Sequence, residues 1–103
     1  MDPKNLYSPG KHILLDLWGV TEQTTQLNFV EDVLRKAANA CGATILEVKL
    51  HSFGENSGLT GVVILAESHM TIHTWPEMDF CAIDIFMCGE CDGCGLWRFK
   101  FAW

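Results

Sequence analysis

One long amphipathic segment with strand-like runs on both sides limits the folds open to this chain. In residues 24–41 apolar side chains recur every three or four positions, and charged side chains fill the opposite side. This pattern predicts a helix with one buried face. Gly42 follows and can take the left-handed backbone conformation that commonly ends a helix. The helix needs another layer to cover its apolar face.

The strand-like runs predict that this other layer is a sheet. In chain order they cover residues 12–18, 44–51, 61–66 and 81–87. The first run is almost wholly apolar and predicts a buried strand. In the second run apolar and polar residues alternate from Leu46 onward, which predicts a strand with one face exposed to solvent. We expect residues 69–76 to join the last two strands in a hairpin. The fold class is therefore α+β, a two-layer sandwich with a mainly antiparallel sheet and helix on one face.

Size and charge narrow the possible partners. The chain has 103 residues, of which 49% are hydrophobic, so we expect a single domain over residues 1–103. Two-sided apolar strands need further cover, which favours self-association. The net charge of −6 argues against nucleic acid. No run is long enough to span a bilayer and residues 1–11 lack a signal-peptide core, so we expect a cytoplasmic protein without a membrane partner.

Side chains capable of chemistry are concentrated between positions 67 and 88. They are Glu67, Ser68, His69, His73, Trp75, Glu77 and Cys88. A hydrolytic triad is one interpretation, but the Gly-x-Ser-x-Gly elbow is absent around Ser68. The plainest alternative treats the two histidines as polar strand residues and Cys88 as a small core residue.

The cysteines allow a metal-binding interpretation as well. The chain has five, at positions 41, 81, 88, 91 and 94, and the last three have the spacing of thiolate ligands to zinc or to an iron–sulfur cluster. The ferredoxin pattern would require a fourth cysteine at position 97, where this chain has Trp97. Cys41 or Cys81 could supply the missing ligand only if the fold brings it next to the other three cysteines.

Two longer stretches resemble a known family. They read ESHMTIHTWPE at residues 67–77 and DIFMCG at residues 84–89. Both are similar to the small prokaryotic pyruvoyl-dependent S-adenosylmethionine decarboxylases, and the resemblance covers residues 11 to about 90. Beyond Gly89 the chain departs from the family pattern, so we expect a divergent or truncated C-terminus.

The resemblance implies a cofactor that the chain makes from itself, and no metal. In the family the serine hydroxyl attacks the carbonyl of the preceding glutamate, and β-elimination then breaks the resulting ester. Here the bond to be cut is Glu67–Ser68, which gives a β chain of residues 1–67 and an α chain of residues 68–103. A pyruvoyl group derived from Ser68 would form a Schiff base with the substrate amine and act as the electron sink.

The resemblance also implies roles for three side chains in this chemistry. His73 matches the proton acceptor in processing, and we expect a turn or a strand pair to bring it back to Ser68. Thr60 stands where the family commonly has a serine that helps processing, so a hydroxyl is retained. Cys88 matches the proton donor in decarboxylation, and a thiol has a reference pKa suited to that role.

Substrate contacts and assembly follow from the same resemblance. Phe53 and Trp75 match aromatic positions near the adenine, and Glu77 matches an acid that hydrogen-bonds the ribose. The implied function is decarboxylation of S-adenosylmethionine to the aminopropyl donor for spermidine synthesis, by a homodimer that pairs sheet to sheet with residues of both subunits near the active site. A pyruvoyl decarboxylase of ornithine or arginine is one alternative, and an unprocessed non-catalytic or Cys-rich metal-binding homologue is another.

Overall fold

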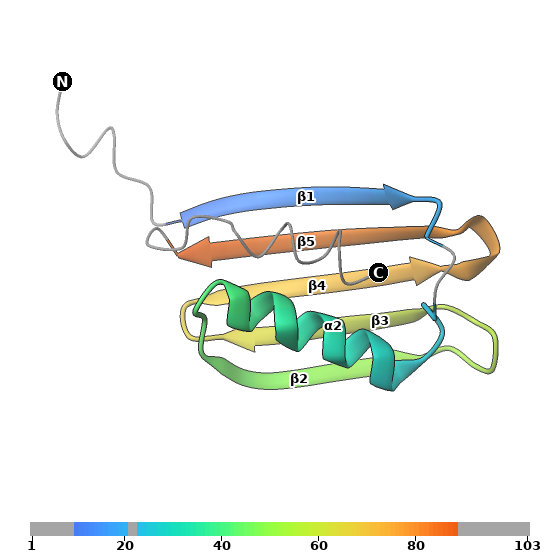
Figure 1. Cartoon of the computed structure of the whole chain (residues 1–103), viewed down its shortest axis with the longest axis horizontal. Coiled ribbons are helices and arrows are strands. Elements are labelled where there is room, and N and C mark those ends of the chain that lie inside the picture. The colour runs from blue at the N-terminus through green and yellow to red at the C-terminus, as the bar shows by residue number, and fades with distance from the viewer. Residues whose placement is uncertain (1–9, 21–22, 89–103) are drawn as a thin grey trace, which may run out of the picture.

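A five-stranded antiparallel sheet with one helix on one face forms the described part of the chain (Figure 1). The computed structural model describes residues 10–20 and 23–88. In chain order the elements are β1 (Gly10–Trp18), α2 (Leu27–Ala40), β2 (Ile45–Ser52), β3 (Leu59–Leu65), β4 (Ser68–Trp75), the 3₁₀ turn η1 (Pro76–Met78) and β5 (Phe80–Cys88). The strand order is β1-β5-β4-β3-β2, so the predicted fold class is confirmed.

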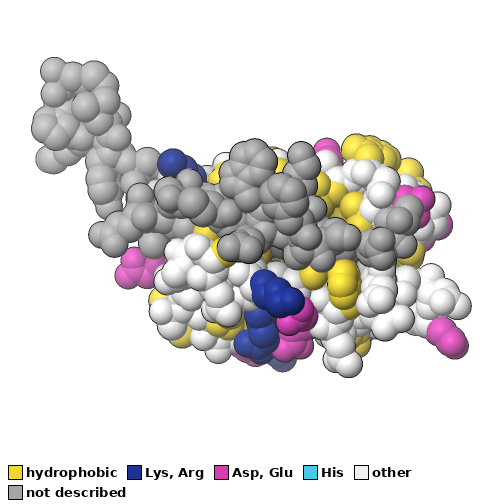
Figure 2. Space-filling model, viewed as in Figure 1, with side chains coloured by type: hydrophobic (Ala, Val, Ile, Leu, Met, Phe, Trp, Pro, Cys, Tyr) yellow, Lys and Arg dark blue, Asp and Glu magenta, His cyan; other side chains and the backbone are white. Residues whose placement is uncertain are grey.

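The helix covers the sheet because its apolar stripe faces the strands. Val30, Val33 and Leu34 are at most 2% exposed, and they pack on inward side chains of the central strands. On the outer side Arg35 pairs with Glu31, and Lys36 pairs with Asp32. The space-filling view shows these basic and acidic side chains next to one another over α2 (Figure 2).

The helix starts three residues later than the sequence pattern predicts. Residues 24–26 form the connection before α2, and Thr24 is buried there. The backbone oxygen of Thr24 accepts a hydrogen bond from the Thr74 hydroxyl at 3.1 Å, and the backbone N–H of Leu59 donates to the same hydroxyl. Thr74 therefore ties the start of the helical layer to the sheet. The end of the helix follows the prediction, since Gly42 has φ +70°.

The segment expected to connect two strands is itself a strand, and the predicted connection is wrong. β4 pairs with β3 on one side and with β5 on the other. Met70, Ile72 and Thr74 point into the core with 0–5% exposure, while His69 and His73 lie on the opposite face. The alternation of this strand was not recognised in the sequence, because only the residues that face the core are apolar and two histidines stand between them.

Two strand predictions also need correction. β1 is an edge strand packed on one face only, so Leu14 and Trp18 are 73% and 67% exposed rather than buried. In β2 a register shift between Ile45 and Glu47 interrupts the alternation, and Leu46 is 63% exposed. Such a bulge inserts one unpaired residue, which sequence periodicity does not reveal. Among the described residues no helix has the length and apolar content to cross a bilayer.

At Gly61 of β3 the side chains of the two neighbouring strands leave no room for a side chain. A Cβ there would lie 2.3 Å from Leu50 Cδ2 and 3.0 Å from Ile72 Cγ2, in a fully buried site. We expect Gly61→Ala to lower the free energy of unfolding by about 1–3 kcal/mol, because the core must shift to admit the methyl group. Urea denaturation followed by tryptophan fluorescence measures the change. Lys36→Ala on the outer helix face is the matched control, with an expected change within about 0.5 kcal/mol, and an equally small effect of Gly61→Ala would contradict the packing described.

Candidate active site

The Glu67–Ser68 peptide lies in a tight turn at one end of the sheet. Leu65 at the end of β3 is paired with Ser68 at the start of β4, so Ala66 and Glu67 alone form the connection. Glu67 has φ +67°, a left-handed conformation that costs a non-glycine residue about 1–2 kcal/mol. Both turn residues are exposed, and Ser68 is half-buried. The bond is thus strained on its acyl side and accessible.

Thr60 and His73 form a hydrogen-bonded pair on the face of the sheet opposite the helix. They are directly opposed residues of β3 and β4, and Thr60 Oγ1 lies 3.0 Å from His73 Nδ1. A bond to Nδ1 fixes the imidazole orientation, as a positioned general base requires. The family resemblance implies a role in processing for both residues, and the structure brings them together.

The same geometry separates His73 from Ser68 within one chain. The two residues are five positions apart on one continuous strand, which corresponds to about 17 Å. An odd separation also places their side chains on opposite faces. The expectation that a turn or a strand pair returns His73 to Ser68 is therefore wrong, because β4 continues without a turn from Ser68 to Trp75.

Cys88 belongs to the same end of the sheet as Ser68. It is the last residue of β5, and its backbone is paired with that of Gly10. Because β5 runs antiparallel to β4 with Phe86 opposite His69, the backbone of Cys88 reaches the turn that holds Glu67 and Ser68. The two residues assigned to cofactor formation and proton donation therefore share one end.

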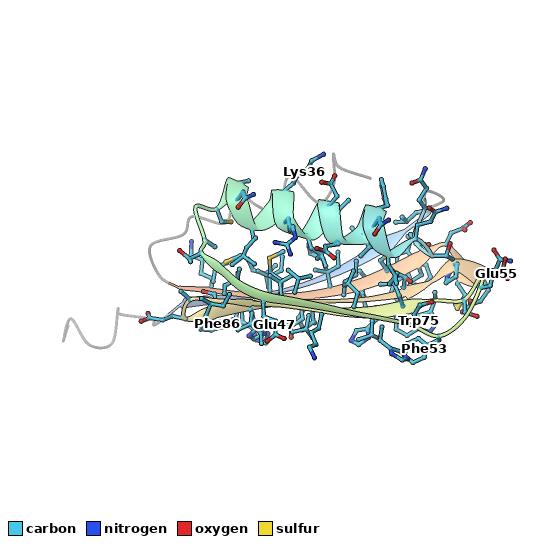
Figure 3. All side chains as sticks on the ribbon, turned by 90° about the horizontal axis from the view of Figure 1, so that it is seen from below. Lys36, Glu47, Phe53, Glu55, Trp75 and Phe86 are labelled. Carbon is cyan, nitrogen blue, oxygen red and sulfur yellow. The ribbon has the colours of Figure 1, made fainter. Side chains whose placement is uncertain are left out.

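The residues assigned to the substrate lie at the other end. Phe53 follows β2 and is 64% exposed, Trp75 ends β4 with 39% exposure, and Glu77 is exposed in η1. Figure 3 shows Phe53 and Trp75 on the face away from the helix, with Phe86 at the opposite end of that face. The Thr60–His73 pair is next to them, since the His73 and Trp75 rings are 6.0 Å apart.

Trp18 and Phe80 also belong to this end of the sheet, although neither was predicted to be a site residue. Trp18 on β1 and Trp75 on β4 both stand opposite Phe80 on β5, and their ring centroids lie 4.2 Å and 5.5 Å from that of Phe80. The result is a row of three aromatic rings across adjacent strands. Only the strand register brings Trp18 and Phe80 into this row, so the sequence alone gave no signal for it.

The buried cysteine of β5, Cys81, lies at the aromatic end of the sheet but on the opposite face from Trp75 and Phe80. Cys81 is fully buried, and desolvation raises the pKa of its thiol to about 11. Its side chain lies on the same face of the sheet as Ile83, and Cys81 is seven residues along β5 from Cys88, which corresponds to about 24 Å. Cys81 therefore cannot complete a metal site with Cys88, while Cys91 and Cys94 lie outside the described residues.

Comparisons with known proteins agree on one family. Residues 11–98 match the family model described as S-adenosylmethionine decarboxylase. The S-adenosylmethionine decarboxylase proenzyme of Methanococcus vannielii is 52% identical over 82 residues, which cover 79% of this chain and 66% of that protein. The proenzyme of Caldanaerobacter subterraneus subsp. tengcongensis is 43% identical over 82 residues, or 79% of this chain and 65% of that protein. The match thus spans just under two thirds of these relatives.

A solved structure gives the same result for the fold. The crystal structure of the adenosylmethionine decarboxylase from Aquifex aeolicus VF5 superposes with a TM-score of 0.74 at 33% sequence identity. The superposition covers 90% of this chain and 75% of that one.

Thiol reactivity tests the assignment of Cys81 to the core. The thiolate is the reactive form, so a buried thiol with a pKa of about 11 should resist alkylation. We expect iodoacetamide at pH 8 to leave Cys81 unmodified in the folded protein and to modify it in urea, as measured by peptide mass spectrometry. Cys41, which is partly exposed, is the internal control. Modification of both cysteines at equal rates in the folded protein would contradict the assignment.

Proposed function

The chain belongs to the S-adenosylmethionine decarboxylase family, and we propose that it is a proenzyme that cuts its own Glu67–Ser68 bond and then decarboxylates S-adenosylmethionine. The observation that carries this proposal is the left-handed conformation of Glu67 in an exposed two-residue turn directly before Ser68. Cleavage of the Glu67–Ser68 bond releases the strain of that turn. The curated relatives are themselves named proenzymes, which supports self-processing.

We propose a homodimer because Ser68 and His73 lie far apart within one chain. His73 is to accept the Cα proton of Ser68, yet about 17 Å of strand separates them. A homodimer removes this distance along the strand when two sheets pair face to face about a two-fold axis with their ends exchanged. The Thr60–His73 end of one copy then lies over the Ser68 end of the other, and symmetry makes two such sites.

The uncovered face of the sheet supports this pairing. Among the described residues it carries several large apolar side chains that are exposed to solvent. They are Leu14 (73%), Trp18 (67%), Phe53 (64%), Ile64 (42%) and Trp75 (39%). The strands are therefore apolar on both faces while a helix covers only one of them (Figure 3). An apolar sheet face of this kind is typical of a surface that a second layer buries.

Each residue then has a role that its position permits. Glu67 supplies the carbonyl that the Ser68 hydroxyl attacks, and Thr60 orients His73 for proton removal. The pyruvoyl group left at position 68 supplies an electrophilic carbonyl and an electron sink for decarboxylation. Cys88, whose backbone reaches the same end of the sheet, returns a proton to the substrate carbon.

The end of the sheet that carries Phe53 and Trp75 offers the contacts that a nucleoside needs. Phe53 and Trp75 present partly exposed rings on which a flat adenine can stack, and a cationic sulfonium gains from nearby aromatic faces. Glu77 is an exposed acid in the adjoining turn and can accept hydrogen bonds from ribose hydroxyls. Ornithine or arginine would leave these rings without a partner, so the nucleoside substrate is favoured. Three further points stay predictions. They are the division into separate chains of residues 1–67 and 68–103, the role in spermidine synthesis, and the cytoplasmic location.

Intact mass tests the cleavage. We expect the purified wild-type chain to separate into fragments divided between Glu67 and Ser68, with the second fragment blocked by a pyruvoyl group. Ser68→Ala should stay uncut, because it lacks the attacking hydroxyl. Cys88→Ala should still be cut but should lose most of its decarboxylation, so it separates the two steps. An uncut wild-type chain after long incubation would contradict self-processing.

Release of labelled carbon dioxide tests the substrate. Processed protein is incubated in parallel with carboxyl-labelled S-adenosylmethionine, ornithine and arginine. We expect release from S-adenosylmethionine alone, and Trp75→Ala should raise KM by about tenfold or more through the loss of one stacking contact. Release from ornithine or arginine at an equal rate would contradict the proposed substrate.

A further inference from the structure

Two histidines and one aspartate meet on the open face of the sheet, at the end where β4 begins. His12 of β1 and His69 of β4 both stand opposite Phe86 of β5, and Asp84 precedes Phe86 by two residues on that strand. His12 Nε2 lies 2.5 Å from Asp84 Oδ1, and His69 Nε2 lies 3.7 Å from the same oxygen. Three adjacent strands thus bring three polar side chains close together.

We propose that His12, His69 and Asp84 bind a divalent transition-metal ion of the zinc type. Imidazole nitrogen and carboxylate oxygen are ligands that such ions prefer, and two histidines with one carboxylate form a recurrent donor set. One donor atom from each residue lies within 4.8 Å of the other two. A tetrahedral ion with bonds of about 2.1 Å holds its ligands about 3.4 Å apart, so small side-chain rotations complete the site.

The surroundings of these side chains favour a preformed site. The Phe86 ring lies 6.0 Å from the His12 ring and 6.2 Å from the His69 ring, and the two imidazole rings are 6.2 Å apart, so each of the three rings contacts the other two. In a single chain the side chains of His12, His69 and Asp84 are 54%, 44% and 35% exposed, so an ion can reach them; in the proposed dimer the partner's sheet covers this end and the ion would lie between the two sheets. Without an ion, His12 and Asp84 hold each other through a hydrogen bond.

This site shares no residue with the Thr60–His73 pair or with the cysteines. It departs from the sequence-based expectation that the protein uses no metal, because that expectation came from the family resemblance and not from these three residues. Ion binding does not rest on the proposed function. If the proposed cleavage occurs, Ser68 becomes the first residue of a new chain, and the ion would hold the next residue, His69, against β5 and β1.

Cobalt substitution tests the proposal, because Co²⁺ reports its ligands through its absorption spectrum. The full-length protein is treated with chelator, passed through a desalting column and titrated with Co²⁺ and then with Zn²⁺. We expect one Co²⁺ per chain, visible d–d absorption without a thiolate charge-transfer band, and displacement by Zn²⁺. A rise in Tm with one equivalent of Zn²⁺ gives a second measurement, since a ligand that binds only the folded state stabilises it.

Three substitutions locate the ion. His12→Gln, His69→Gln and Asp84→Asn keep the size of each side chain, and each should weaken Co²⁺ binding at least tenfold and abolish the rise in Tm. His51→Gln, on the same sheet but outside the cluster, should bind as the wild type does. Absence of Co²⁺ and Zn²⁺ binding up to millimolar concentration would overturn the proposal. So would binding that survives the three substitutions or that shows thiolate bands.

Discussion

The uninterrupted course of β4 through the middle of the sheet is the constraint on which the site depends. Hydrogen bonds to β3 and β5 hold this strand on both sides, and Met70 and Ile72 anchor it in the core with no exposure to solvent. A strand held in this way cannot fold back on itself. Ser68 and His73 are therefore fixed at opposite ends, although only five positions separate them in the sequence.

This constraint divides the chemistry of the chain into two groups. The end near the β3–β4 turn holds the strained bond before Ser68 and the backbone of Cys88, while the other end holds the Thr60–His73 pair and the aromatic row. Neither group is a complete active site. The face between them carries exposed apolar side chains, and in the proposed two-fold pairing of these faces each group would complete the other.

The sequence predicted the helix, four strands and the family, because these depend on local periodicity and on a long contiguous motif. It missed β4, since only alternate residues of that strand are apolar and His69 and His73 interrupt the pattern. The bulge at Leu46 and the exposure of Trp18 depend on pairing register and on the edge position of β1. The His12, His69 and Asp84 cluster was invisible for the same reason, because register alone joins residues so distant in the chain.

A mixed-chain experiment tests most directly whether the active site is shared between two copies. Ser68→Ala, which keeps His73, is co-expressed with His73→Ala, which keeps Ser68, under two different affinity tags, and mixed dimers are isolated through both tags. We expect the His73→Ala chain to be cut after Glu67 in mixed dimers, whereas each variant alone stays uncut. Cleavage of the His73→Ala chain by itself, or its failure to be cut in purified mixed dimers, would contradict a site built from both chains.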